Sequence, residues 1–304
     1  MNYCKTICTD VKERPIKTSG TGKKELLSYY EKAGPDYATW SKKFNMHFGY
    51  FSKGMNPFNR EAMLENMNLQ VFKRLKLDRV SNGTLVDLGC GLGATLRTAG
   101  ANFPHLQLIG LTLVPWQVQQ ARELNNVQEC NKEIQIIEAD YCAIPLEDAS
   151  VDSVLAIESS CYAPGASKYR LFKEIYRVLK PGGHFVIADG FLKSNASMGL
   201  FIRRAYNKLC QSWALTELGN IKNVEKSILA LNFKDYHIEE RSWNVAPSVA
   251  HVPFTVLTFL TRQLIFGGAP MCKERWDNLK SPLLTLILGL TRKHFGYYLI
   301  SGTK

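Results

Sequence analysis

This sequence of 304 residues lacks a long hydrophobic run. No apolar stretch reaches the roughly 18 residues that a membrane-spanning helix requires, which excludes a transmembrane helix. The two most apolar segments, residues 253–269 and 282–290, are short, and Arg262 interrupts the first of them. They predict buried helices, the lining of a lipophilic binding site, or an interfacial surface.

Metal-ligand spacing and a secretory signal are lacking as well. The eight cysteines include no CxxC pair, so we expect reduced thiols and no bound metal. Residues 1–24 are polar and contain no apolar core of a signal peptide. We therefore expect a cytoplasmic location, with a membrane-peripheral location as the alternative.

Acidic residues are too few to balance the basic ones, and the formal net charge is +11. This excess favours an anionic partner, either a substrate or a membrane surface. The basic residues are dispersed and do not alternate with aromatic residues, so we expect no nucleic-acid partner. The oligomeric state is not predicted.

From residue 84 onward, strand patterns alternate with helical patterns, which predicts an α/β fold with a doubly wound, mostly parallel sheet. After residue 190 the pattern is helical, apart from two strand-like runs near the C-terminus. We therefore expect a seven-stranded sheet whose last hairpin is split by a helical cap. The expected strands are 85–88, 107–113, 134–139, 153–157, 184–189, about 236–245, and 295–301.

The first strand runs into a glycine-rich turn that contains Asp87, Gly89, Gly91 and Gly93. Glycine lets the backbone pass close to a ligand, and the following helix offers free N–H groups. A dinucleotide-binding turn or a structural turn are the alternatives. The GxGxG spacing, with an acid two residues before the first glycine, resembles the first motif of class I S-adenosylmethionine-dependent methyltransferases.

That resemblance implies a Rossmann-like fold and S-adenosylmethionine as cofactor, with Asp87 ordering its amino group. Ligands of such sheets bind beyond the carboxyl ends of the strands. The residues that we expect to bind the cofactor there, besides Asp87 and the three glycines, are Thr112, Leu113, Gln117, Asp140 and Tyr141.

Thr112 stands where most class I members carry an acidic residue. Residues 110–113, followed by Gln117, resemble the branch that contains tocopherol, cyclopropane-fatty-acid and sterol methyltransferases. This resemblance implies that Thr112 and Gln117 contact the nucleoside. Asp140 and Tyr141 suit the adenine ring, and the alternative for Asp140 is a helix cap.

Three residues are candidates for catalysis. Residues 156–163 resemble the corresponding stretch of sterol C-methyltransferases, and Glu158 there is placed to face a cation. The alternative is a salt-bridged scaffold residue. Residues 47–50 are similar to a lid segment of the same branch, in which Tyr50 offers a ring face to a cation and His47 is either catalytic or packed.

We therefore expect an enzyme that transfers methyl from S-adenosylmethionine to carbon of a lipophilic isoprenoid, through a carbocation. A prenyl diphosphate would be anionic and would use Arg203 and Arg204, whereas a sterol or triterpene-like substrate would use the apolar cap. The alternatives are N- or O-methylation of a lipophilic small molecule, with His47 or His251 as base, and a non-catalytic cofactor-binding protein.

The expected organisation has five parts. They are a polar tail (1–24), an N-terminal helical lid (25–80), a cofactor-binding Rossmann-like core (81–190), a helical cap with the late sheet strand (191–294), and a final strand (295–304).

Overall fold

The computed structural model describes residues 20–127, 133–194, 197–267 and 270–304. Most of the expected polar tail, residues 1–24, lies outside the described residues. The described chain begins with helix α1 (Gly20–Ala33), followed by a 3-10 turn, η1 (Gly34–Asp36), and helix α2 (Tyr37–Trp40).

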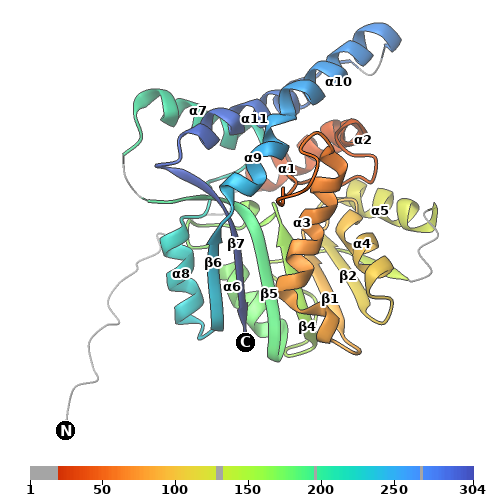
Figure 1. The fold of residues 1–304 in the computed structure, drawn as a ribbon, viewed down its shortest axis with the longest axis vertical. Helices are drawn as coiled ribbons and strands as arrows, with labels where there is room; N and C mark the ends of the chain where they lie inside the picture. The colour runs from red at the N-terminus through yellow and green to blue at the C-terminus, as the bar shows by residue number, and fades with distance from the viewer. Residues whose placement is uncertain (1–19, 128–132, 195–196, 268–269) are drawn as a thin grey trace.

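A seven-stranded sheet forms the centre of the molecule, in the order β3-β2-β1-β4-β5-β7-β6 (Figure 1). Strand β7 runs antiparallel to β5 and β6, and the other neighbouring strands are parallel. This arrangement confirms the predicted doubly wound sheet. The strands are β1 (Thr84–Leu88), β2 (Gln107–Thr112), β3 (Ile134–Glu138), β4 (Val151–Ile157), β5 (Leu179–Leu192), β6 (Lys234–Glu240) and β7 (Phe295–Thr303).

Helices cover both faces of the sheet, which explains why its central strands are almost wholly apolar. Helices α3 (Arg60–Leu75), α4 (Ala94–Asn102) and α5 (Pro115–Val127) pack on one face. Helices α6 (Tyr169–Val178) and α8 (Ile221–Ala230) pack on the other. The short 3-10 turns η2 (Leu77–Arg79) and η3 (Ser160–Tyr162) belong to connecting segments.

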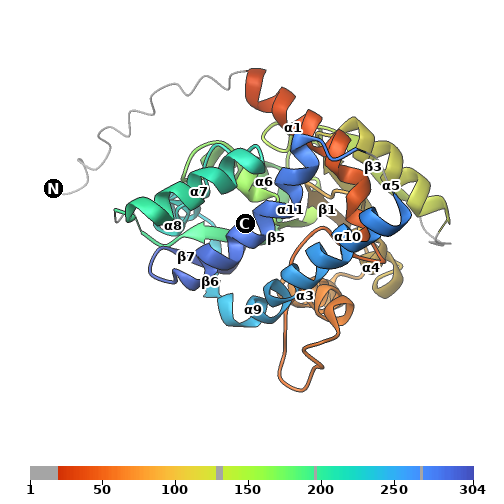
Figure 2. The same cartoon turned by 90° about the horizontal axis from the view of Figure 1, so that it is seen from above.

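The remaining helices form a roof over the end of the sheet to which the parallel strands point (Figures 1 and 2). The lid helices α1 and α2 meet the cap helices there. The cap consists of α7 (Leu200–Ser212), α9 (Ser242–Ala250), α10 (Val252–Phe266) and α11 (Lys273–Leu290). Because α9 to α11 lie between β6 and β7 in the chain, the last hairpin is split by helices, as the sequence predicts.

A buried ion pair fastens the lid to the cap. The Arg275 guanidinium of α11 donates two hydrogen bonds to the Asp36 carboxylate, at 2.9 and 2.8 Å, and both side chains are 7% exposed. Tyr29 of α1 donates a further hydrogen bond to Asn278 Oδ1 of α11 at 2.9 Å. Paired donors and acceptors of this geometry stabilise a buried charge that would otherwise be costly.

One expectation about the cap differs from the structure. The strand expected over 236–245 ends at Glu240, and helix α9 follows it. Trp243 and Val245 would share one face of a strand, but in α9 they lie on opposite sides, with Trp243 exposed and Val245 in the core. Helix α10 is buried on one side only, through Val252, Val256 and Phe259. In the described part of the chain, no helix has the length and apolar content needed to cross a bilayer.

The ion pair between lid and cap gives a prediction about stability. Asp36→Ala leaves a buried guanidinium without its carboxylate, so we expect the free energy of unfolding to fall by about 3–5 kcal/mol. Lys32→Ala is the matched control, because its pair with Glu274 also joins lid to cap but lies at the surface, where an ion pair contributes little. Urea denaturation measures both; equal losses would show that the buried pair does not fasten the roof.

Candidate active site

A cavity of about 460 Å³ lies at the carboxyl ends of the central strands, under the lid. Its lining brings together residues that are far apart in the sequence. His47 and Glu158 line the cavity, while Gly93 and Tyr50 are not among its lining residues. The predicted cofactor residues that line it are Asp87, Gly89, Gly91, Thr112, Leu113, Gln117, Asp140 and Tyr141.

The glycine turn after β1 adopts a backbone that favours glycine. Gly89, Gly91 and Gly93 have φ values of +79°, +54° and +76°, in the left-handed region. A Cβ on Gly91 would also lie 3.0 Å from Met46 Sδ, and one on Gly89 only 2.4 Å from the Cβ of Ser159. The glycines therefore serve the packing of the turn itself, and Gly93 acts as the N-cap of α4.

Asp87 presents a buried carboxyl group to the cavity. It is 3% exposed and makes no hydrogen bond or ion pair with a described residue. Burial raises its pKa to about 8, because the charged form loses its hydration. A ligand that carries a cationic amino group would supply the missing partner, so this residue fits the amino group of the expected cofactor.

Thr112 and Gln117 form a connected pair in the wall of the same cavity. The Thr112 hydroxyl donates to Gln117 Oε1 at 2.6 Å and accepts from the Val114 N–H at 3.3 Å. Within the described residues, the Gln117 amide nitrogen has no partner. It is thus available to donate to a ribose hydroxyl, and Thr112 holds it in place.

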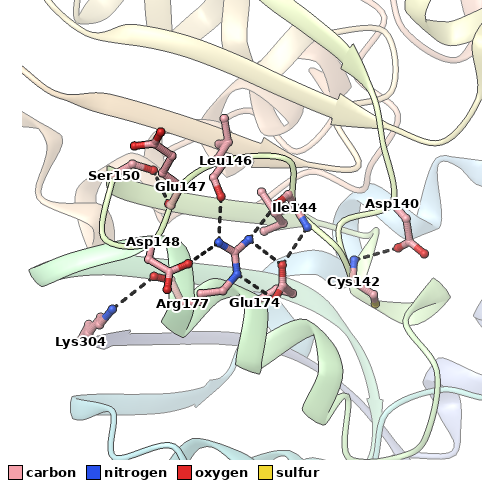
Figure 3. Close-up of polar contacts among 10 residues, drawn as sticks. All are labelled: Asp140, Cys142, Ile144, Leu146, Glu147, Asp148, Ser150, Glu174, Arg177 and Lys304. Carbon is pink, nitrogen blue, oxygen red and sulfur yellow. Dashed lines mark hydrogen bonds and ion pairs between the residues drawn. The ribbon is translucent and has the colours of Figure 1, made fainter.

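The loop after β3 carries Asp140 and Tyr141. Asp140 is exposed and accepts a hydrogen bond from the Cys142 N–H at 2.8 Å, so it stabilises a turn of its own loop as well as lining the cavity (Figure 3). The Tyr141 hydroxyl donates to the Ser159 carbonyl at 2.7 Å. This bond ties the β3 loop to the loop after β4.

Arg177 of helix α6 holds the loop after β3 in place. This residue was not predicted as part of the site from the sequence. Arg177 donates to the carbonyls of Ile144 and Leu146, at 2.7 and 2.8 Å, and Glu174 accepts from the Ile144 N–H at 2.8 Å (Figure 3). These bonds position the loop that lines the larger cavity.

Glu158 has the most constrained position in the site. It follows β4 with φ at +50°, and its Oε1 accepts from the Phe48 N–H at 2.8 Å and from the Tyr297 hydroxyl at 3.0 Å. It makes no ion pair with a described residue, so the salt-bridged alternative is not what the structure shows. Burial, helped by nearby Asp189, raises its pKa to about 8, although both hydrogen bonds act in the opposite direction.

A second cavity, of about 80 Å³, lies between the lid and the cap. Glu158 lines both cavities, as do Asn45, Met46 and His47. The second cavity also has four aromatic residues in its wall, Tyr37, Trp40, Phe48 and Trp213, together with Arg60 and the polar Ser248 and Asn278. Glu158 is therefore shared between a polar cavity over the glycine turn and an aromatic cavity under the cap.

His47 is held on both sides of its ring. Nδ1 lies 2.9 Å from the Phe48 carbonyl and Nε2 lies 3.1 Å from Asn68 Oδ1. Burial lowers its pKa. Asn68 is itself bonded to Asn45 and Thr95. Because both ring nitrogens are engaged, the packed alternative fits His47 better than a proton-transfer role.

Tyr50 does not take the position that the sequence analysis gave it. It is 6% exposed, packs in the core cluster with Met67 and Val71, and lines neither cavity. Its backbone N–H donates to the Met63 carbonyl, which ties the lid segment to α3 and turns the ring inward. The catalytic assignment of Tyr50 is therefore corrected to a core position.

The other basic candidates also lie outside the two cavities. His251 is occupied by the Pro57 carbonyl, 2.7 Å from its Nε2. Arg203 and Arg204 are exposed on α7 and line neither cavity, so they do not serve as phosphate ligands at this site. In the described ranges, no three His, Cys, Asp or Glu side chains converge on a place for a metal ion.

Two site residues were missed because their signal is not local. Tyr297 comes from β7 and reaches Glu158 only through the antiparallel pairing of β7 with β5, in which Gly190 lies opposite Tyr297. Asp189, buried at the end of β5, accepts from the Ser160 hydroxyl at 2.6 Å and from the Cys161 N–H at 2.9 Å. It thereby shapes the loop that carries Glu158.

Comparisons with known proteins agree with this geometry. A family model described as a methyltransferase domain matches residues 86–187. Over 175 residues, the chain is 34% identical to a cycloartenol-C-24-methyltransferase of Arabidopsis thaliana, and the match covers 55% of this chain and 49% of that protein. The chain spans about half the length of the curated relatives that it matches first.

Solved structures share the fold over nearly the whole chain. A cyclopropane synthase from Mycobacterium tuberculosis has a TM-score of 0.77 at 16% identity, covering 93% of this chain and 98% of that one. A geranyl diphosphate C-methyltransferase from Streptomyces coelicolor A3(2), solved with Mg²⁺, geranyl-S-thiolodiphosphate and S-adenosyl-L-homocysteine, has a TM-score of 0.68 at 14% identity, covering 95% and 99%.

The chain thus contains a methyltransferase domain of class I, with a Rossmann-like fold, that resembles the sterol and isoprenoid C-methyltransferases. This confirms the predicted cofactor, S-adenosylmethionine. The unpaired Asp87 carboxyl and the free Gln117 amide are the features of this chain that fit the cofactor, at its methionine and ribose ends respectively.

The position of Asp87 predicts that cofactor binding depends on pH. Without ligand, the carboxyl is protonated below about pH 8, and it must ionise to pair with the cofactor amino group. We expect affinity to rise from about pH 6 to about pH 7.5, before an α-amino group itself deprotonates. In calorimetric titrations, Asp87→Asn should bind the cofactor weakly, and its affinity should not rise with pH. In denaturant unfolding, the same variant should be at least as stable as the wild type, because it removes a buried ionisable group that lacks a partner. A wild-type affinity that does not change with pH would contradict the assignment.

The Thr112–Gln117 pair predicts non-additive effects on cofactor affinity. Thr112→Val and Gln117→Ala should each weaken binding by about 0.5–1.5 kcal/mol, since each removes part of one hydrogen-bonded unit. The double variant should lose less than the sum, because the two residues act together. Strictly additive losses in the double-mutant cycle would show that Thr112 and Gln117 contact the cofactor separately.

Proposed function

We propose that the chain transfers the methyl group of S-adenosylmethionine to a carbon atom of a lipophilic isoprenoid alkene. The observation that carries the proposal is the Glu158 carboxyl group, which lines both the cofactor cavity and the aromatic cavity. The sequence similarity to a cycloartenol-C-24-methyltransferase and to a sterol 24-C-methyltransferase of Kluyveromyces lactis supports carbon as the acceptor.

The cofactor, when bound, supplies a methyl group already activated on a sulfonium, so the protein needs to position and protect rather than activate it. The alkene electron pair forms the new carbon–carbon bond as the carbon–sulfur bond breaks, and a positive charge remains on the neighbouring substrate carbon. That cation must be kept from water until it loses a proton.

The aromatic cavity is suited to such a cation. The rings of Tyr37, Trp40, Phe48 and Trp213 line it, and aromatic faces attract positive charge. Arg60 also lines it and already lies over the Trp40 ring, 5.9 Å from the ring centroid, so the faces of Tyr37, Phe48 and Trp213 carry the argument. Tyr37 and Trp40 come from the lid and Trp213 from the end of α7. The cavity is thus complete only when lid and cap are packed together.

Glu158 is the group that we place next to the developing charge. As a carboxylate it stabilises the cation and accepts the proton that restores a double bond, so charge and atoms balance. The Phe48 N–H and the Tyr297 hydroxyl fix Oε1, which leaves Oε2 without a described partner. A raised pKa makes the carboxylate a stronger base than an exposed glutamate.

The acceptor is a prenyl diphosphate or a sterol or triterpene-like molecule. The aromatic and apolar lining under the cap supports a neutral polycyclic or linear isoprenoid. Arg203 and Arg204 line neither cavity, but Lys23 and Arg170 line the first cavity and Arg60 the second, so a diphosphate also has cationic candidates there. Two buried donors in residues that line the aromatic cavity, Trp40 Nε1 and Asn278 Nδ2, have no partner among the described residues and would suit an oxygen on the acceptor.

N- or O-methylation of a small molecule is the alternative and would use Glu158 as the base beside a polar acceptor; the similarity to C-methyltransferases favours carbon. His47 has both nitrogens engaged and His251 lies outside the cavities. A non-catalytic cofactor-binding protein would not need a buried carboxyl group between two cavities.

The test is single-turnover methyl transfer, with cofactor affinity measured alongside. At saturating cofactor we expect Glu158→Gln to lower the rate at least about tenfold, or 1.4 kcal/mol in the barrier, with little change in cofactor affinity. The wild-type rate should rise with pH toward about 8, as Glu158 ionises. If Glu158→Gln loses affinity and rate in equal proportion, Glu158 is a cofactor ligand and the proposed role is wrong.

Tyr297 offers a sharper variant with a matched control. Tyr297→Phe removes a hydrogen bond that lowers the pKa of Glu158, so the pH profile should move to higher pH while the maximal rate is retained. Tyr298→Phe, at the adjacent position of β7 and in the core cluster of the other sheet face, should leave the profile in place. Equal shifts in both variants would show that the hydrogen bond to Glu158 does not set the profile.

A further inference from the structure

Helix α10 carries an exposed apolar face that no described residue covers. Phe254, Leu257, Leu264 and Ile265 are 71%, 64%, 86% and 66% exposed, and we call these four residues the α10 apolar face. They follow one another at helical spacing along the helix. Exposed apolar side chains scattered singly need no explanation, but a series of them along one helix marks an interaction surface.

Two threonines beside the α10 apolar face add little cost to removing water from it. Thr258 and Thr261 lie between the apolar residues and are exposed. Their hydroxyls donate to the carbonyls of Phe254 and Leu257, at 2.8 and 2.7 Å. Because each hydroxyl is satisfied inside its own helix, it loses little when water is removed from the face.

Helix α10 is anchored to the body by its opposite side. Val252, Val256 and Phe259 pack against Trp40 of the lid and Leu279 of α11. Figure 1 shows α10 extending outward from the rest of the cap. The exposed face is therefore held by a packed helix and does not arise from a loose segment.

The segments that contain α10 and α7 carry basic residues and no acidic ones. Residues 242–267 contain no acidic residue, and their one formal charge is Arg262, which is exposed. Residues 197–216 contain no acidic residue either and include the exposed Arg203 and Arg204, next to the exposed Leu200 and Phe201 of α7. Helices α7, α11 and α10 are neighbours across the cap (Figure 2).

We propose that the α10 apolar face docks on the surface of a lipid bilayer that contains anionic lipid. An apolar face on a helix that carries an exposed arginine and no acidic residue complements the interface of such a bilayer, where side chains enter the acyl boundary and cations meet the headgroups. The acids of the neighbouring α11, Glu274 and Asp277, are each paired with lysines. The length and composition of α10 suit lying on a bilayer rather than crossing it. The same cap encloses the aromatic cavity, so docking would bring the acceptor site to the membrane in which lipophilic isoprenoids dissolve.

The test is flotation of the full chain with vesicles of phosphatidylcholine, with and without phosphatidylserine. We expect the protein to float with the phosphatidylserine vesicles and to bind them less at high salt. Leu264→Ser should reduce the partition coefficient at least about tenfold, which corresponds to 1.4 kcal/mol. Arg262→Gln should weaken binding to the anionic vesicles alone.

Leu229→Ser is the matched control, since Leu229 is 53% exposed on α8, on the flank of the sheet away from α10 (Figure 1). It should float like the wild type. Absence of flotation, or an equal loss in Leu229→Ser and Leu264→Ser, would overturn the proposal. So would sedimentation velocity that shows a dimer abolished by Leu264→Ser without a change in flotation, because a second copy would then be the occupant. None of these readouts depends on methyl transfer.

Discussion

Two carboxyl groups buried without a cationic partner are the constraint on which the site depends. Asp87 and Glu158 lie at the ends of adjacent parallel strands, β1 and β4, and burial raises the pKa of each to about 8. A folded protein keeps such groups at a cost to its stability. In the proposed function, this cost is offset when positive charge arrives, from the cofactor at Asp87 and from the reacting substrate at Glu158.

The lid and cap helices that cover the end of the sheet keep these two carboxyl groups buried by excluding water. The Asp36–Arg275 pair and the bond from Tyr29 to Asn278 fasten the lid to the cap. The Phe48 N–H, on the lid segment, reaches down to Glu158, and Tyr297 reaches it from the last strand. Lid, core and final strand therefore meet at one carboxylate oxygen. Opening the roof would rehydrate Glu158 and expose the aromatic cavity at the same time.

The fold and most of the residues that line the larger cavity could be predicted from the sequence because their signals are local. A strand that runs into Asp87 and alternate glycines, and polar residues at the ends of further strands, are read from short windows, and parallel strands bring such ends together. The roles of Tyr297, Asp189 and Arg177 could not be predicted in this way, since they arise from strand register and from a helix that packs under a loop. Tyr50 is a local prediction that failed. A sequence motif places a residue in a segment, but it does not determine whether the side chain points to the site or into the core.

The most direct test of the account is the position of the transferred methyl group. The protein would be given S-adenosylmethionine labelled with ¹³C in the methyl group, together with isoprenoid alkenes that include a prenyl diphosphate and a sterol, and the product examined by NMR. The account predicts a new bond from the labelled methyl to carbon, with a double bond restored by loss of a proton. A label on oxygen or nitrogen of the accepted substrate would contradict it.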